Sequence, residues 1–133
     1  MASASSIELS TWTNMLRTQN LTTYVADLDG DIIGTVLFLT MPNLGYDCRP
    51  SGFLEAMVVA AVHRRRGVAR RLLDRVLTDA REAGCHKIQL LTHKRHATDG
   101  AHDLYRSMGF ESEAEGFRLY LDSATTSAAG SQS

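Results

Sequence analysis

The feature that most constrains the fold is a helical pattern of apolar residues that lies between two short apolar runs. Over residues 67–83 these side chains recur every fourth position on two adjacent ridges, Val68, Leu72, Val76 and Ala80 on one and Ala69, Leu73 and Leu77 on the other. This spacing predicts an amphipathic helix. Residues 53–59 before it and 87–92 after it predict buried strands. Together the three segments predict a right-handed, parallel βαβ unit.

The flanking segments extend this prediction to an α/β domain with a mixed sheet. Residues 24–26 and 32–40 predict two antiparallel strands joined at Asp29-Gly30, a frequent hairpin turn. The other elements expected are a short helix that starts at Ser10 or Thr11 and ends near Asn20, an exposed loop over 42–51, a helix over 101–108 stopped by Gly109, and a closing strand over 117–121.

Composition is that of an ordinary globular protein. The 133 residues suit one domain, and the formal net charge is −1. Residues 1–9 and 122–133 are rich in Ser, Ala and Thr, so flexible termini are expected around a domain of residues 10–121. Cys48 and Cys85 have neither a CxxC spacing nor the density of a secreted scaffold. With no apolar leader and no run of ~20 apolar residues, a cytoplasmic location is expected.

The turn that opens the 67–83 helix has the composition of an anion-binding site. The first N–H groups of a helix lack intrahelical partners, and the helix dipole adds partial positive charge there. Gly67 and Ala69 leave the main chain accessible. Five arginines supply positive charge around it, namely Arg64, Arg65, Arg66, Arg70 and Arg71. This arrangement predicts a site for a pyrophosphate group.

Two motifs resemble those of the GNAT superfamily of acyl-CoA-dependent N-acetyltransferases. Arg64, Gly67 and Ala69 fall on the three defining positions of the acetyl-CoA signature Q/R-x-x-G-x-G/A. The segment AHDLYRSMGF is similar to a second motif, in which a tyrosine on a short helix precedes a Gly-Phe pair. The resemblance covers about residues 23–121. It implies a mixed, mostly antiparallel central sheet flanked by helices, with a splayed βαβ cofactor site.

The resemblance also implies where acetyl-CoA would bind as the acyl donor. Its pantetheine arm is expected in the splay between residues 55–59 and 87–92, paired with main-chain groups of Met57, Val58 and Val59. A backbone N–H in that stretch is expected to stabilise charge on the thioester oxygen. The diphosphate is expected on the turn that is formed by Arg64, Arg65, Arg66, Gly67, Val68, Ala69 and Arg70.

Two side chains are candidates for proton transfer, each with a structural alternative. Glu55 lies on the predicted cofactor strand, where the family often places a carboxylate that accepts the amine proton directly or through water. Its alternative roles are to orient a loop or to pair with an arginine. Tyr105 matches the family tyrosine that protonates the departing thiolate, since a phenol of pKa ~10 is protonated at neutral pH. Its alternative role is packing between helix and sheet.

The remaining charged segments do not indicate another class of protein. The run HRRRGVARR has no interleaved aromatic residues, and the near-neutral net charge argues against a nucleic-acid partner. The histidines of HKRHATDGAH, taken with Cys85 and His86, match no zinc spacing, so no metal is expected. No membrane partner is expected. Tyr46, Asp47 and Arg49 are candidates for substrate contact or plain surface residues.

The expected function is transfer of an acetyl group to a primary amine by direct attack within a ternary complex. The leading hypothesis is a small-molecule amine, because residues 90–110 are similar to family members that acetylate such compounds. The alternatives are a protein or peptide N-acetyltransferase and a non-catalytic acyl-CoA-binding module. About twenty residues precede the hairpin, where the family usually has a further strand and helix. A shortened chain, or completion by a partner subunit as in a homodimer, is therefore expected.

Overall fold

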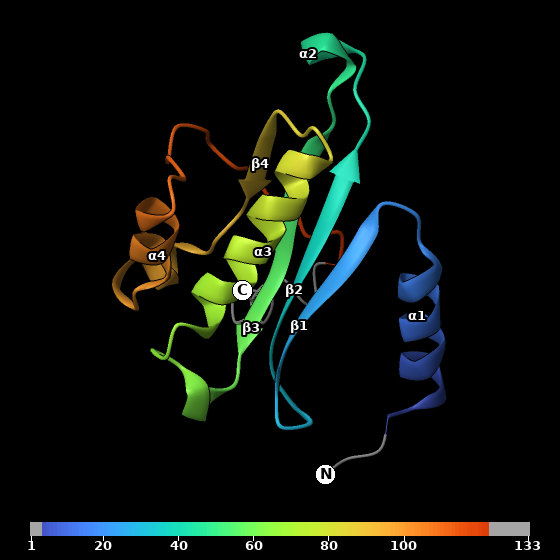
Figure 1. Ribbon diagram of the computed structural model, residues 1–133, viewed down its shortest axis with the longest axis vertical. Coiled ribbons are helices and arrows are strands. Elements are labelled where there is room, and N and C mark those ends of the chain that lie inside the picture. Colours follow the sequence, from blue (N-terminus) through green and yellow to red (C-terminus); the bar gives the residue numbers. More distant parts are fainter. Residues whose placement is uncertain (1–3, 123–133) are drawn as a thin grey trace. The chain divides into compact units, whose positions relative to one another are not determined.

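The computed structural model describes residues 4–122, which form two compact units that meet in sequence between Leu90 and Leu91 (Figure 1). The first unit contains α1 (Ser6–Arg17), β1 (Leu21–Leu28), β2 (Asp31–Met41), α2 (Gly45–Cys48), β3 (Ser51–Val59), the 3-10 turn η1 (Ala61–His63), α3 (Val68–Glu82) and β4 (Lys87–Leu90). The second contains the 3-10 turn η2 (Lys94–Thr98) and α4 (Ala101–Ser107). Of the helices within the described range, none is long and apolar enough to cross a bilayer.

The first unit is built on a four-stranded mixed sheet in the order β1-β2-β3-β4. β1 and β3 both pair antiparallel with β2, and β4 pairs parallel with β3. The hairpin predicted at Asp29-Gly30 is confirmed, and both turn residues have positive φ, 51° and 92°. Because a two-residue turn of this kind matches the twist of paired strands, Asp29 and Gly30 set the register of β1 against β2. The α/β class and the parallel βαβ unit predicted from the sequence are confirmed.

The core of the first unit forms where α3 packs across the sheet, which Figure 1 shows with α3 in front of the strands. The side chains buried there are Leu72, Leu73, Val76 and Ala80 from the helix and Val36, Phe38 and Leu54 from the strands. They include four of the seven positions that the helical spacing predicted, and the other three, Val68, Ala69 and Leu77, are half-buried. The first turn of α3 approaches the sheet closely, since a Cβ placed on Gly34 of β2 would lie 3.0 Å from Val68 Cγ1. The start of α3 is therefore fixed over the middle of the sheet.

The first helix begins earlier than the sequence interpretation expected, which placed its start at Ser10 or Thr11 and a flexible end over residues 1–9. α1 begins at Ser6 and ends at Arg17. Its N-terminus is a capping box, in which Ser5 Oγ accepts from Glu8 N at 3.1 Å and Glu8 Oε2 accepts from Ser5 N at 2.6 Å. This reciprocal pairing satisfies two free backbone donors and offsets the weak burial of the helix. Residues 1–3 lie outside the described residues.

The closing strand predicted over residues 117–121 is wrong. The segment is irregular, and Phe117, Leu119 and Leu121 are 88%, 82% and 93% exposed. An alternating apolar pattern forms a strand only where its backbone groups find a partner, and the second unit has no strand within residues 91–122. Of the predicted flexible tail, residues 122–133, all but Asp122 lie outside the described residues.

Candidate functional site

The predicted splay starts halfway along β3. The parallel ladder with β4 runs from Ser51 opposite Lys87 to Leu54 opposite Leu90, and it ends there. Beyond Leu54, the rest of β3 continues to pair with β2 only, as far as Val59 opposite Gly34. Within the described part of the first unit, residues 55–59 therefore present one edge with no neighbouring strand. An open edge of this kind offers main-chain groups to a ligand that lies along it.

A β-bulge lies at the start of the open edge. Thr35 pairs with Val58 and Leu37 pairs with Glu55, so two steps along β2 face three steps along β3. The extra residue is accommodated by Ala56, whose φ is +51°. A non-glycine residue in this region costs on the order of 1–3 kcal/mol and is retained where surrounding structure imposes it. The bulge bends β3 and re-aims the main chain of residues 55–58 where β4 leaves it.

The turn between β3 and α3 fits an anion. Gly67 is the N-cap residue of α3 with φ +80°, and it provides no side-chain hydrogen bond to cap the helix. A Cβ placed on Gly67 would meet no heavy atom within 4 Å, so the space beside the helix start is open. No acidic residue lies in the first turn of α3. The free N–H groups of this turn and the positive end of the helix dipole therefore face space that a diphosphate could fill.

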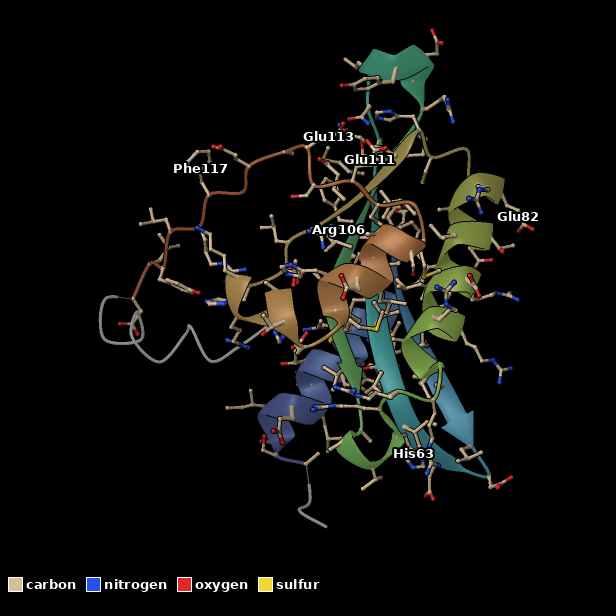
Figure 2. All side chains as sticks on the ribbon, turned by 90° about the vertical axis from the view of Figure 1, so that its left-hand side faces the viewer. His63, Glu82, Arg106, Glu111, Glu113 and Phe117 are labelled. Carbon is tan, nitrogen blue, oxygen red and sulfur yellow. The ribbon has the colours of Figure 1, made fainter. Side chains whose placement is uncertain are left out.

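The arginines of the turn are exposed around that space. Arg64 folds back toward the strand and donates from Nε to Val59 O at 3.2 Å, which ties the turn to the end of β3. Arg65 has φ +63° and its side chain is exposed, as are those of Arg66 and Arg70. Figure 2 labels His63 on η1, immediately before these residues. Several guanidinium groups can thus approach one polyanion without being buried first.

The first unit brings most of the predicted site residues onto one continuous stretch of chain. Glu55 is exposed and lies at the bulge, one residue beyond the last parallel pair. Met57, Val58 and Val59 follow on the open edge. The turn then leads directly into Val68 and Ala69 of α3, both of which are partly exposed. β3, its bulge and the start of α3 therefore form one candidate site for a long ligand with an anionic end.

Tyr105, the predicted acid, belongs to the second unit and lies on α4. Its ring meets Phe110 edge-on with centroids 5.9 Å apart. Burial raises the pKa of Tyr105 above its usual value, and the negative charge of Asp99 raises it further. The phenol is therefore held in its protonated form, as a general acid at neutral pH requires.

Tyr46, Asp47 and Arg49 lie in or beside the short helix α2, which Figure 1 shows beyond the end of β2. Arg49 donates from its guanidinium to Gly84 O and Cys85 O, both at 3.0 Å, and so joins this loop to the end of α3. The Tyr46 ring stacks on His86 with centroids 3.7 Å apart. Asp47 lies in the left-handed turn of α2. These contacts join the loop to the end of α3 and the start of β4, and a role of Tyr46, Asp47 or Arg49 in substrate contact stays a prediction.

The sequence interpretation missed the role of Asp99. His96 Nδ1 and Asp99 Oδ2 are hydrogen-bonded, and Asp99 Oδ1 accepts from Ala101 N at 3.0 Å. The pattern of the segment HKRHATDGAH indicates loop histidines that match no zinc spacing, and it does not by itself assign Asp99 a partner. The usable signal was an aspartate two residues before the start of a helix, which is a common way to satisfy the first N–H groups. Within residues 4–122, no three His, Cys, Asp or Glu side chains gather as metal ligands would.

Comparisons with known proteins agree with this arrangement. The sequence model of the Acetyltransferase (GNAT) family matches residues 2–110. N-acetyltransferase 8 of Rattus norvegicus is 35% identical over 98 residues, which are 71% of this chain and 41% of that protein. The Mus musculus protein of the same name is 35% identical over 96 residues and is covered to 40%. The chain thus spans about two fifths of the length of these curated relatives.

Solved structures show the same fold. A structure from Agrobacterium tumefaciens str. C58 that is assigned as an acetyltransferase has a TM-score of 0.81 and 30% identity, with 90% of this chain and 83% of that one covered. Glucosamine-6-phosphate N-acetyltransferase from Arabidopsis thaliana has a TM-score of 0.77 and 17% identity, with 92% and 82% covered, and so shares the fold alone. From the family match, the two motifs and the splayed sheet, the chain belongs to the GNAT family of acetyltransferases.

Proposed function

We propose that the protein transfers an acetyl group from acetyl-CoA to the primary amine of a small molecule by direct attack in a ternary complex. The observation that carries the proposal is the continuity of the open β3 edge with the uncapped start of α3. One chain segment provides main-chain groups for an extended ligand and, at its end, an anion site. Acetyl-CoA, which supplies an activated acyl group on a long arm with a diphosphate, matches both features.

The diphosphate would be held by the turn formed by Arg64, Arg65, Arg66, Gly67, Val68, Ala69 and Arg70. The backbone N–H groups at the start of α3 donate to phosphate oxygens, and the absence of a side chain at Gly67 lets these oxygens approach. The exposed guanidinium groups add charge and planar donors. This part of the site would supply affinity and fix the position of acetyl-CoA. It would take no direct part in the transfer of the acetyl group.

The main chain of Met57, Val58 and Val59 would hold the arm of the donor along the open edge of β3. A backbone N–H here, re-aimed by the bulge at Ala56, would donate to the thioester carbonyl oxygen as negative charge develops on it. Removal of one such donor typically raises the activation barrier by a few kcal/mol. The bulge would thus orient the backbone N–H that stabilises the transition state.

Glu55 would accept the proton that the acceptor amine must lose. An alkylamine of pKa ~10 is neutral in only about one part per thousand at pH 7, so the free base costs roughly 4 kcal/mol. The Glu55 carboxylate is exposed beside the bulge, where it can act directly or through water. Its structural alternative, in which it only pairs with an arginine or orients a loop, predicts no effect on the pH profile of turnover.

Tyr105 would donate a proton to the departing thiolate. Its raised pKa, caused first by burial and then by Asp99, keeps the proton on the phenol, where it can be donated or hydrogen-bonded to the thiolate as the carbon–sulfur bond breaks. The amine nitrogen would form the new bond to the thioester carbon and the carbon–sulfur bond would break, so no covalent acyl-enzyme is required. Glu55 as base and Tyr105 as acid complete the proton balance of the transfer.

A thiol-release assay tests this function against its two alternatives. Acetyl-CoA is supplied with a panel of small primary amines and, separately, with peptides that carry a free α-amino group or lysine. Thiol release with small amines supports the proposal, and release with peptides alone supports a protein N-acetyltransferase. Saturable binding of acetyl-CoA with no release from any acceptor supports an acyl-CoA-binding module.

A further inference from the structure

Asp99 joins the two helical elements of the second unit through both of its carboxylate oxygens. Oδ2 is hydrogen-bonded to His96 Nδ1 on η2. Oδ1 accepts from Ala101 N, the first residue of α4, at 3.0 Å. The residue between them, Gly100, has φ +94° and offers no side chain to cap the helix. Asp99 therefore supplies the cap that Gly100 cannot, and the same carboxylate anchors the helix to η2.

The carboxylate is also held in its charged form. The hydrogen bond from His96 lowers the pKa of Asp99, and the N–H of Ala101 lowers it further. Both contacts favour the ionised carboxylate. The His96 side chain that makes this contact is only 23% exposed. A fixed negative charge thus lies just before the first turn of α4.

Tyr105 lies one helical turn after Ala101, and the charge of Asp99 contributes to its raised pKa. The same two elements carry further titratable groups, which are Lys94, Arg95 and His96 on η2 and His102, Asp103 and Arg106 on α4, the last of which is labelled in Figure 2. Asp103 and Arg106 form an exposed contact of 3.7 Å with each other. Of the charged groups, Asp99 is the one whose field favours the protonated phenol of Tyr105.

We propose that Asp99 is a positioning residue for Tyr105: its carboxylate, bonded to His96 and to Ala101 N, fixes the first turn of the helix that carries the phenol and places a negative charge at the start of that helix. The inference rests on the proposed function only in so far as Tyr105 acts as the acid. Its physical content, the coupling of one carboxylate to one phenol inside the second unit, can be measured without any acetyl transfer.

The sharpest test is Asp99→Asn in the full chain, because the amide keeps the shape and the acceptor for Ala101 N but removes the charge. The readout is the titration of the Tyr105 ring carbon bonded to oxygen, followed by carbon-13 NMR and assigned with Tyr105→Phe. We expect the titration of Tyr105 to move to lower pH in the variant. Asp103→Asn, which removes an exposed carboxylate from the same helix, is the matched control and should leave the titration in place.

Enzyme kinetics then separate positioning from simple stability. In Asp99→Asn the alkaline limb of kcat should move to lower pH together with the phenol titration, whereas KM for acetyl-CoA stays constant. Asp99→Glu retains the negative charge, so the alkaline limb of its kcat profile should lie closer to that of the wild type than the limb of Asp99→Asn does. A folded Asp99→Asn variant with an unmoved Tyr105 titration would overturn the inference. If the titration moves but the wild-type protein transfers no acetyl group, the coupling stands and the proposed function fails.

Discussion

Leu54 and Leu90 form the last pair of the parallel ladder, and one residue later β3 becomes an open edge. Leu54 is buried against the core, so the end of the ladder is fixed by packing on α3 rather than by a loose strand terminus. The buried face of α3 packs on this part of the sheet. The same helix begins directly after Gly67, which provides no side-chain cap. Core packing and the candidate donor site are thus two consequences of one strand–turn–helix segment.

Glu55→Gln tests the general base. The amide has nearly the same shape but cannot accept a proton, so kcat at neutral pH should fall by about 10²-fold or more. Initial rates over a pH series measure the effect, and the loss should shrink at high pH, where the amine is already neutral. Glu82→Gln, at the far end of α3 and labelled in Figure 2, serves as the matched control. An unchanged kcat in Glu55→Gln would leave Glu55 a structural role.

Tyr105→Phe tests the general acid. Loss of the phenol proton should lower kcat by about 10²-fold, with little change in KM for acetyl-CoA, because the hydroxyl acts on the leaving group. The raised pKa of Tyr105 predicts that wild-type turnover persists above pH ~10 before the phenol ionises. Tyr24→Phe, which removes a hydroxyl from β1 of the first unit, is the control. Equal kcat in wild type and Tyr105→Phe would remove Tyr105 from the mechanism.

Leu73→Ala tests the core beneath the site. Leu73 is fully buried on α3, and truncation of such a side chain costs about 2–5 kcal/mol of unfolding free energy. Leu44→Ala removes the same atoms from a side chain that is 95% exposed and should cost well under 1 kcal/mol. Urea unfolding followed by circular dichroism compares the two. Similar losses for both variants would mean that α3 does not form the core described here.

Tyr24→Phe tests a link between the sheet edge and α3. Tyr24 Oη donates to Asp79 Oδ2 at 2.6 Å, and burial, followed by this hydrogen bond, raises the pKa of Tyr24. A raised folded-state pKa gives stability that is complete below the unfolded value of ~10 and is lost as the pH rises above it. Wild type should therefore exceed Tyr24→Phe in unfolding free energy at pH 8, and by less at pH 10.5. A constant difference would argue against the link.

Much of the fold follows from the periodicity of apolar residues. The parts that the sequence did not predict have different causes. The apolar ridge that includes Leu73 and the Asp29-Gly30 turn are local signals, and both predicted the correct elements. The start of α1 was also local, in the spacing of Ser5 and Glu8, but the Ser-rich composition outweighed it. Residues 117–121 differ, because alternation does not specify whether a backbone partner exists.

For the candidate site, the sequence indicated the turn at Gly67 and the open part of β3, because both lie on one short segment with a recognisable pattern. It did not indicate the bulge at Ala56, since no residue there favours positive φ. Nor did it place Arg49, whose two backbone acceptors lie more than thirty residues later in the chain. Contacts between distant residues are set by packing, which a single sequence does not encode in any short pattern.

The most direct test of the account is calorimetric titration of the full chain with acetyl-CoA at near-physiological ionic strength. Gly67→Glu places bulk and negative charge where the diphosphate should lie. Gly84→Glu makes the same change at the other end of α3, where φ is also positive, +78°, and the space is equally open. We predict saturable binding by wild type and Gly84→Glu, and none by a folded Gly67→Glu. Absence of binding by wild type, or equal binding by all three, would contradict the account.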